Sequence, residues 1–385
     1  MNKCPRCFSV LGDDQYAWTV SPLADGERYI DPVASAFVGT DTESGPIYSV
    51  TRPPGFRGPL LSASDAANAL NAPVVEICPV CHVILPEAWR NGHAICIAMA
   101  GTPATGKSTY LAVLIKQMEL LCEGLGVSMA PATRASAKAY VQNYEQPLYE
   151  ERGLIPPTPT LQTQPPHQRE PLIFTIGIRA GIQHFLVIRD VAGEDLETGD
   201  MRSSRFRYFS NADAVFFMFD PLRVKAIRDQ LHDLLPAQSY SAGDPRALLT
   251  NVLLAIGSGR PKLAVILSKF DALRALGEVE GSEWSQVMSN AGAAYLRDNS
   301  GGRYYDHNDG ELLHEEVRSL LLRLHAGSIV TAVESRSREL QLMHRYFVVS
   351  ALGQPHTGAR LSSGGITPFR CTDPARWITT SAGVL

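Results

Sequence analysis

Residues 94–108 read Ala-Ile-Cys-Ile-Ala-Met-Ala-Gly-Thr-Pro-Ala-Thr-Gly-Lys-Ser, an apolar run that passes directly into Gly-x-x-x-x-Gly-Lys-Ser. Leu111, Leu114, Ile115, Met118 and Leu121 then fall on one helical stripe, which predicts a helix ending near Gly124. In this strand–loop–helix context, glycines let backbone N–H groups converge on a phosphate at the positive end of the helix. The pattern is typical of a Walker A phosphate loop (P-loop) and predicts binding of a nucleoside triphosphate, with Lys107 at the phosphates and Ser108 on Mg²⁺.

Three later apolar segments end in polar residues. Phe185–Arg189 runs into Asp190-Val-Ala-Gly193, which predicts Asp190 as a second Mg²⁺ contact and Gly193 as a close backbone neighbour of a γ-phosphate. Lys262–Leu267 is followed by Ser-Lys-Phe-Asp, and Tyr346–Val349 is followed by Ser-Ala-Leu. Alternation of strands and helices predicts an α/β fold with a mainly parallel sheet flanked by helices.

These four motifs, in this order, resemble the Ras-like P-loop GTPase superfamily. The resemblance implies that Asp271 accepts hydrogen bonds from the guanine N1–H and 2-amino group, which adenine lacks, so GTP rather than ATP is expected. It also implies that Lys269 lies along the base and that residues 350–352 approach the base carbonyl. The expected nucleotide-contacting residues are Gly101, Thr102, Pro103, Ala104, Thr105, Gly106, Lys107, Ser108, Thr109, Gly193, Ser268, Lys269, Asp271, Ser350, Ala351 and Leu352.

Three longer segments narrow this resemblance. They are Asp190–Asp195, Ala214–Pro221 and Gly365–Trp377, and they are similar to the bacterial double-GTPase group of the TRAFAC class. The similarity covers about residues 94–380 at the level of motifs. It implies a regulatory GTPase of a multi-component bacterial system, some members being proposed to act in defence or conflict signalling.

The expected hydrolytic residues are Lys107, Glu194 and Arg205. Glu194 stands where Ras-like enzymes commonly carry glutamine, and a carboxylate beside an anionic phosphate predicts slow or partner-dependent hydrolysis. Glu194 could equally cap a helix N-terminus. Arg205, in the segment Met201–Arg207, could act as an arginine finger; the competing interpretation, which we favour, is a solvated cationic face or ion pairs with nearby acids.

The first switch segment is expected between the phosphate-loop helix and the strand near residues 172–178. Its candidate is Ile155–Thr163, a proline-dense stretch that cannot form regular helix or inner strand. Thr158, followed by Thr160, is the expected third Mg²⁺ contact. The alternative is a stiff connector in which these threonines are incidental.

Two Cys-x-x-Cys pairs precede the phosphate loop. Cys4, Cys7, Cys78 and Cys81 could supply four thiolates to a tetrahedral Zn²⁺, although the gap between the pairs far exceeds the usual ribbon spacing. A long insertion would then loop out of a zinc-ribbon-like module. The alternatives are a c-type haem attachment at Cys78–His82, which requires export, or disulfides, which a reducing cytosol disfavours. Cys96 and Cys122 are expected to be small buried residues.

Size and charge set the outer limits. The 385 residues, 45% of them hydrophobic, allow a sizeable core, and we expect a module over residues 1–92 and a P-loop GTPase domain over residues 93–385. A net charge of −4 without a basic run indicates neither nucleic-acid nor anionic-membrane binding. No apolar stretch is long enough to cross a bilayer, so a cytoplasmic location is the default expectation.

The sequence therefore predicts a GTP-binding and GTP-hydrolysing regulatory switch with GTP/GDP, Mg²⁺ and Zn²⁺ as its cofactors. An activating protein or effector is the expected partner, and nucleotide-dependent dimerisation is a further option. Two alternatives stay open. One is a P-loop ATPase; the other is a non-enzymatic scaffold that nucleotide merely stabilises.

Overall fold

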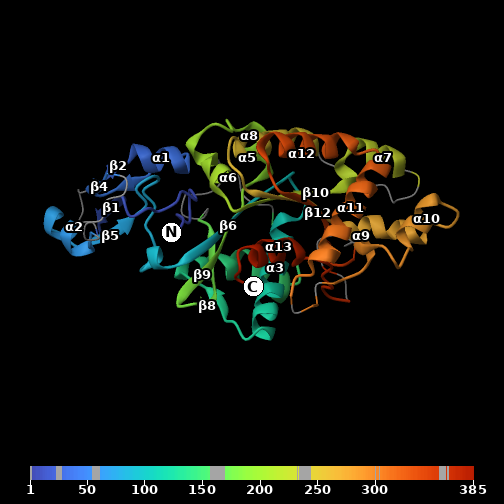
Figure 1. Ribbon diagram of the computed structural model, residues 1–385, viewed down its shortest axis with the longest axis horizontal. Coiled ribbons are helices and arrows are strands. Elements are labelled where there is room, and N and C mark those ends of the chain that lie inside the picture. Colours follow the sequence, from blue (N-terminus) through green and yellow to red (C-terminus); the bar gives the residue numbers. More distant parts are fainter. Residues whose placement is uncertain are drawn as a thin grey trace.

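The structure is a computed structural model that describes residues 2–22, 28–53, 61–156, 170–231, 233, 244–299, 301–302, 304–354, 361 and 364–385. Thr158 and Thr160, the expected first-switch threonines, lie outside these residues. Figure 1 shows a large sheet at the centre, helices on both of its faces, and a smaller group of N-terminal elements at one end.

Seven strands of the described chain form the central sheet, in the order β12-β11-β10-β6-β9-β8-β7. The five strands from β12 to β9 pair in parallel, whereas β8 and β7 are antiparallel to their neighbours. The prediction of an α/β protein with a mainly parallel sheet is confirmed. The strands are β6 (His93–Gly101), β7 (Met129–Pro131), β8 (Leu172–Arg179), β9 (Ile182–Arg189), β10 (Ala214–Phe219), β11 (Lys262–Leu267) and β12 (His344–Val348).

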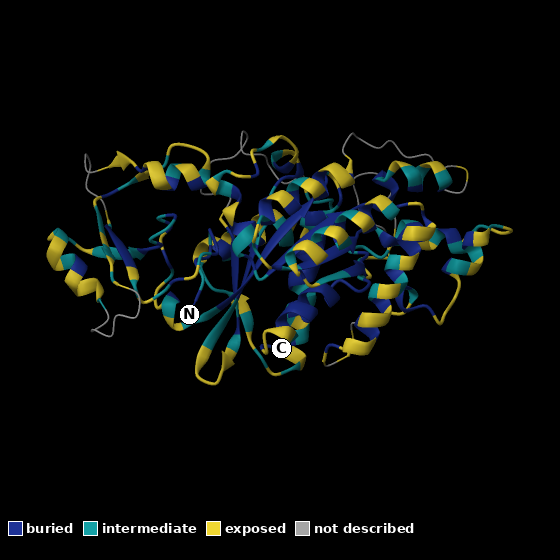
Figure 2. Ribbon diagram, turned by 45° about the horizontal axis from the view of Figure 1, so that its top comes forward, coloured by how far each residue is buried: buried dark blue, intermediate teal, exposed yellow. Residues whose placement is uncertain are grey.

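The inner strands are apolar along their whole length because helices cover both faces of the sheet. Every residue of β10 is buried, as are eight of the nine residues of β6. Figure 2 shows this buried band running through the middle of the molecule, while the helices present mixed buried and exposed faces. A parallel sheet enclosed in this way needs continuous hydrophobic runs, and these were the clearest strand signals in the sequence.

Helices α5, α6, α8 and α12 pack together on one face, and α3 and α13 lie on the other (Figure 1). The apolar pattern predicts two helices between residues 222 and 261, the second over Ala247–Ile256, and α7 and α8 are found there. The α-helices are α3 (Lys107–Gly124), α4 (Arg134–Tyr140), α5 (Gly193–Thr198), α6 (Arg207–Asn211), α7 (Lys225–Leu231), α8 (Pro245–Ile256), α9 (Phe270–Arg274), α10 (Glu283–Met288), α11 (His307–Arg323), α12 (Gly327–Leu340) and α13 (Asp373–Ser381). A π-helix, η2 (Val141–Glu150), follows α4. The short 3-10 helices of this part are η4 (Ser204–Phe206), η5 (Pro221–Arg223), η6 (Ala275–Glu278) and η7 (Ala294–Leu296).

The apolar pattern predicts a helix over Ile329–His344, but α12 ends earlier, at Leu340. Its C-cap residue Gln341 is in the left-handed region with φ of 55°, which stops the helix. His344 instead begins β12. The local apolar pattern continues across this change from helix to strand, so periodicity alone could not place it.

The N-terminal elements form a second, smaller sheet in the order β4-β1-β5. Tyr16, Trp18 and Ala66 form its small core, which is separate from the main one. Figure 1 shows this group at the end of the molecule farthest from α10. Its elements are β1 (Gln15–Val20), β2 (Tyr29–Ile30), α1 (Pro32–Val38), β3 (Glu43–Ser44), β4 (Ile47–Thr51), α2 (Ala63–Leu70) and β5 (Val74–Ile77), and η1 (Trp89–Asn91) follows.

The segments on either side of this small sheet pack on the central one. Cys4, Phe8 and Trp89 belong to the same continuous buried cluster as β6. Trp89 contacts Phe185 of β9, with ring centroids 4.5 Å apart. The core is therefore continuous across residue 92, where the sequence placed a boundary.

Candidate functional site

The glycine-rich loop joins β6 to α3 at the carboxyl end of the parallel strands. A Cβ on Gly101 would meet the Met218 carbonyl of the neighbouring strand, so the loop leaves the sheet where only glycine fits. Gly106 has φ of 82° and forms the N-cap of α3. Inside the loop, the Thr105 hydroxyl donates to the Thr102 carbonyl at 2.9 Å.

Lys107 lies almost entirely inside the protein, with 5% of its surface exposed. Its Nζ donates to the Gly101 carbonyl at 3.2 Å, so the side chain folds back over its own loop. Burial lowers the pKa of this ammonium, and the charges of Asp190 and Glu194 oppose that effect. A buried cation beside a glycine-rich loop at a helix N-terminus can hold an anion.

The segment from Asp190 to Gly193 lies against this loop. A Cβ on Gly193 would stand 2.7 Å from the Gly101 carbonyl oxygen and from Pro103, so the two backbones can lie this close only because residue 193 has no side chain. The Asp190 carboxylate accepts the Val191 N–H at 2.9 Å. Asp190 follows β9 and the glycine-rich loop follows β6, so both come after the carboxyl ends of two parallel neighbouring strands.

Glu194 is exposed in the first turn of α5. Arg205 packs on its own segment, with its guanidinium carbon 4.7 Å from the centre of the Phe206 ring. Among the described residues, the Arg205 Nε has no hydrogen-bond partner.

A cavity of about 310 Å³ opens beside the loop. It combines loop residues with the ends of β11 and β12, which are distant in sequence. Lys107, Ser108 and Gly193 lie next to the cavity but are not part of its lining. The lining residues are Thr105, Gly106, Thr109, Tyr110, Leu154, Met218, Asp220, Leu222, Ser268, Lys269, Asp271, Ala272, Val349, Ala351, Leu352 and Gln354.

Polar contacts arrange the far wall of this cavity. The Ser350 hydroxyl donates to the Asp271 carboxylate at 2.5 Å and accepts the Gly353 N–H at 3.0 Å. Lys269 has φ of 50° and forms an ion pair with the buried Asp220 at 3.1 Å. The Ser268 hydroxyl is buried and finds no partner in the described part of the chain. The cavity therefore offers a carboxylate, an ammonium and an unused hydroxyl to a ligand.

The sequence did not reveal a strap that supports this wall. Phe369 exchanges two backbone hydrogen bonds with Ser350, at 2.9 and 3.1 Å. Two residues further on, the Cys371 thiol donates to the Ser350 carbonyl, and the Cys371 backbone carbonyl accepts the Tyr110 hydroxyl of α3 at 3.0 Å. The segment Phe369–Cys371 thus joins both sides of the cavity. No local pattern could indicate these partners, because each lies on another part of the chain.

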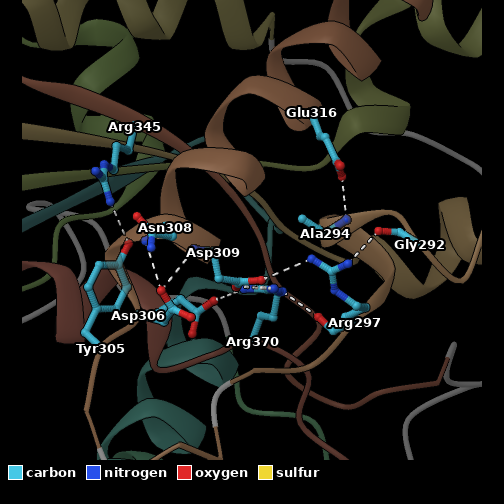
Figure 3. Close-up of polar contacts among 11 residues, drawn as sticks. Gly292, Ala294, Arg297, Tyr305, Asp306, Asn308, Asp309, Glu316, Arg345 and Arg370 are labelled. Atoms are coloured by element: carbon cyan, nitrogen blue, oxygen red, sulfur yellow. Dashed lines mark hydrogen bonds and ion pairs between the residues drawn. The ribbon is translucent and has the colours of Figure 1, made fainter.

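Arg370, in the middle of the strap, is 1% exposed and fixes it to α11. Its guanidinium forms an ion pair with Asp309 at 2.6 Å and a second one with Asp373. Its Nε donates to the Arg297 carbonyl at 2.7 Å, and Arg297 also reaches Asp309 (Figure 3). These contacts hold the C-terminal segment against the helical layer.

The four cysteines of the two Cys-x-x-Cys pairs lie together in the buried core that also includes β6. Their sulfur atoms all lie within 4.8 Å of one another and are buried. All seven cysteines are unbonded thiols in this structure. Cys96 and Cys122 are buried as predicted.

The fold and the site define a class: an α/β protein with a mostly parallel, helix-covered sheet, a glycine-rich loop beside a polar cavity, and a four-cysteine cluster. The sequence profile of the domain described as "ESX-1 scaffolding and assembly protein SaeC N-terminal domain" matches residues 14–76. A protein of Mycolicibacterium smegmatis described as "Putative ESX-1 scaffolding and assembly protein SaeC" is 64% identical over 385 residues, which is the whole of both chains. The chain therefore belongs to the SaeC family.

This membership overturns several expectations drawn from the motifs. The resemblance to the double-GTPase group is wrong, since the full-length relative belongs to a scaffolding and assembly family. The expected GTP-hydrolysing switch, and with it the description as a P-loop hydrolase, is wrong for the same reason. We therefore assign no hydrolytic role to Lys107, Glu194 or Arg205. Four short motifs covered few residues, whereas family membership rests on the whole length of the chain.

The similarity to solved structures is low. Era from Aquifex aeolicus bound to GDP·AlF4⁻ is 12% identical with a TM-score of 0.23, and 68% of this chain matches 52% of that one. A bacterial selenocysteine-specific elongation factor, EF-Sec, is 12% identical with a TM-score of 0.29, and 76% of this chain matches 29% of that one. The chain thus spans about half or less of these proteins. Scores this low carry no functional argument.

Within the described residues, no helix is both long enough and apolar enough to cross a membrane.

Proposed function

We propose that this protein is an assembly scaffold of an ESX-1 secretion system and that it holds a guanine nucleotide as a structural ligand without turning it over. The scaffold role is supported by the 64% identity over the full length of the M. smegmatis relative. Its partners are then protein components of that secretion system. This proposal corresponds to the second alternative from the sequence, a non-enzymatic scaffold that a nucleotide stabilises.

The nucleotide is supported by the cavity that borders the glycine-rich loop. Phosphates would lie on the loop from Gly101 to Thr109, where backbone N–H groups and buried Lys107 supply positive charge. The base would lie between Lys269 and residues 350–352, with Asp271 accepting from guanine. The volume of about 310 Å³ lies at the lower end of the range for small-molecule pockets.

Mg²⁺ belongs to the same proposal. Ser108 and Asp190 would hold it beside the phosphates, where it would offset their charge. Carboxylate and hydroxyl oxygens are the donors that this ion prefers. Thr158, the third expected contact, lies outside the described residues.

The finer fold class is also proposed. A Ras-like arrangement is supported by the glycine-rich loop after β6 and by the placement of residues 268–271 and 350–352 at the ends of β11 and β12. A zinc-ribbon-like module is supported by the four-cysteine cluster. The division at residues 92 and 93 would then separate two parts of the chain. The first carries residues 14–76, which match the SaeC profile and are called the family-specific segment below, and the second binds the nucleotide.

A first experiment tests the bound nucleotide. The purified full-length protein is denatured, and released nucleotides are counted by chromatography; about one guanine nucleotide per chain is expected. Added GDP should raise the free energy of unfolding by about 2.7 kcal/mol at a hundredfold excess over its Kd. Asp271→Asn should weaken GDP binding, whereas Glu280→Gln, which changes an exposed carboxylate outside the cavity lining, should not. Steady phosphate release over many turnovers, or equal stabilisation by ADP, would contradict the proposal.

A second experiment tests the scaffold role. A strain that lacks the gene is complemented with the wild-type protein, with Asp271→Asn or with Glu280→Gln, and ESX-1 components that copurify are measured together with secretion of ESX-1 substrates. We expect the wild type and Glu280→Gln to restore both. Normal assembly and secretion in the strain without the gene would remove the scaffold role, whatever the nucleotide result.

A further inference from the structure

Two short hairpins, one on each side of the family-specific segment, share one local structure. Each begins with Cys-Pro-x-Cys and turns at a residue with positive φ, which is Phe8 at 58° in the first and His82 at 55° in the second. The N–H of that residue donates to the carbonyl of the first cysteine in both cases, Cys4 at 3.0 Å and Cys78 at 2.9 Å. Positive φ is uncommon for residues other than glycine, so its recurrence at the same position marks a repeated design.

The remaining hydrogen bonds repeat as well. The N–H of each first cysteine donates to the carbonyl two residues beyond its second cysteine, at 2.8 Å in both hairpins. An isolated bridge closes each hairpin, between Lys3 and Val10 in one and between Ile77 and Ile84 in the other. Val10 and Ile84 are both exposed, and the leucines that follow them are both buried. The two hairpins are therefore equivalent units that face each other.

Their sulfur atoms are spaced for a metal ion. Across the two hairpins, Cys4 Sγ lies 3.5 Å from Cys81 Sγ, and Cys7 Sγ lies 3.8 Å from Cys78 Sγ. Four sulfurs at the Zn–S distance of about 2.3 Å around a tetrahedral ion stand about 3.8 Å apart. A disulfide would require about 2.05 Å. The spacing thus fits a shared ion.

The surroundings suit negative sulfur. In each hairpin a backbone N–H points at the sulfur of the first cysteine at 3.4 Å, from Arg6 to Cys4 and from Val80 to Cys78. Arg189 of β9 lies over the Tyr208 ring and donates to the Arg6 carbonyl at 2.5 Å, which brings a half-buried cation to the first hairpin. Four thiolates and one Zn²⁺ carry a net charge of −2, and cations and N–H donors offset that charge.

We infer that Cys4, Cys7, Cys78 and Cys81 bind one Zn²⁺ and that this ion clasps the two ends of the family-specific domain, residues 14–76, against the central sheet. On binding, the four thiols release their protons to solvent and the sulfurs become thiolate ligands; no oxidation or reduction takes place. The domain emerges after the first hairpin and returns into the second. A single ion therefore joins its entry to its exit.

Contacts on both sides show what the clasp would hold in place. Toward the sheet, Asn211 donates to the Cys7 carbonyl at 3.0 Å, and Lys3 forms an ion pair with Asp213 at 2.6 Å. Toward the domain, His82 and Asp31 are 2.7 Å apart, and Arg90 reaches the carbonyl of Gln15 at 2.8 Å. The ion lies between these two sets of contacts. Its loss should loosen residues 14–76 and leave the distant cavity intact.

The experiment uses the full-length protein purified with added Zn²⁺. Mass spectrometry of metal content should give about one zinc per chain for the wild type and for Cys122→Ala, a buried cysteine on α3 that serves as the matched control. The double variant Cys4→Ser/Cys78→Ser should lose nearly all zinc. Cobalt exchanged into the wild type should show the visible absorption of a tetrahedral tetrathiolate site, which tests the ligand set without any mutation.

Hydrogen exchange then tests the clasp itself. Stripping zinc from the wild type with a chelator should raise exchange in residues 14–20 and 74–77 and leave exchange in residues 349–352 unchanged. Wild-type protein without zinc, or zinc retained by the double variant, would overturn the metal site. Unchanged exchange in residues 14–20 after zinc removal would overturn the clasp. None of these results depends on the nucleotide proposal, since that is read from GDP binding alone.

Discussion

Replacement of Arg370 by methionine tests how the C-terminal strap is held. Methionine keeps much of the side-chain volume but leaves the carboxylates of Asp309 and Asp373 without this partner, at 8% and 4% exposure. Breaking a buried ion pair from one side costs about 3–5 kcal/mol. Asp309 keeps the contact with Arg297 at 3.4 Å, which places the expected loss of unfolding free energy toward the lower value, about 3 kcal/mol.

The loss should depend on pH in a defined direction. Burial already raises the pKa of Asp373 above its ordinary value of 3.8, and Arg370 opposes that rise. Without Arg370 the folded-state pKa moves higher still. A carboxyl with a raised folded-state pKa contributes stability below its unfolded pKa and loses it as the pH rises through the folded value. The deficit of Arg370→Met should therefore be smaller at pH 5 than at pH 8.

Urea unfolding followed by circular dichroism gives the global loss, and hydrogen exchange of α13 and of residues 349–352 shows whether the strap loosens first. Arg28→Met removes an exposed ion pair with Glu43 and should cost less than about 1 kcal/mol. Arg370→Lys keeps the charge, but its three N–H donors share one nitrogen and cannot span the three acceptors that the guanidinium reaches, so its stability should fall between that of the wild type and that of Arg370→Met. A loss below about 1 kcal/mol for Arg370→Met, or a deficit that grows as the pH falls, would refute the reasoning.

Three further changes give separate tests. Gly193→Ala forces a Cβ to within 2.7 Å of the Gly101 carbonyl and should cost about 1–3 kcal/mol in thermal unfolding, whereas Gly124→Ala, which meets nothing within 4 Å, should be neutral or slightly stabilising. Lys107→Met should stabilise the nucleotide-free protein near pH 8, because burial lowers the pKa of the Lys107 ammonium from 10.5. The wild type regains stability as the pH rises toward 10.5, so the difference in unfolding free energy between the variant and the wild type should shrink. A difference that stays constant with pH would contradict a buried, charged Lys107. Asp31→Ala removes the carboxylate that accepts two N–H groups at the start of α1 and that contacts His82. It should lower the free energy of unfolding by about 2 kcal/mol and speed hydrogen exchange in α1. Exchange like that of the wild type would show that the cap is dispensable.

The GTPase expectation failed for a physical reason. The motif residues do lie around one loop and cavity, and Asp271 and Gly106 line the same space. Turnover, however, depends on sub-ångström placement of water and charge beside the phosphate, which a motif does not encode. The 64% identity to the M. smegmatis relative, in contrast, extends over the whole chain and not over short motifs.

The family-specific segment carried no readable signal. The described strands between residues 14 and 77 are short, and their core consists of Tyr16, Trp18 and Ala66 with a few partly buried neighbours. Only the match to the SaeC N-terminal domain profile related this segment to a family. A surface that binds proteins needs shape and exposed groups, and neither has a fixed spacing along the chain.

The amino-acid sequence alone was enough for the apolar strands of the large sheet other than β7, for the turn of the glycine-rich loop and for the two Cys-x-x-Cys pairs, because these depend on neighbours a few residues apart. Tertiary structure alone brought the four sulfurs together across a long insertion and joined Arg370 to Asp309. Such contacts arise when packed layers bring distant segments together, and a local pattern of residues holds no record of which segments those are.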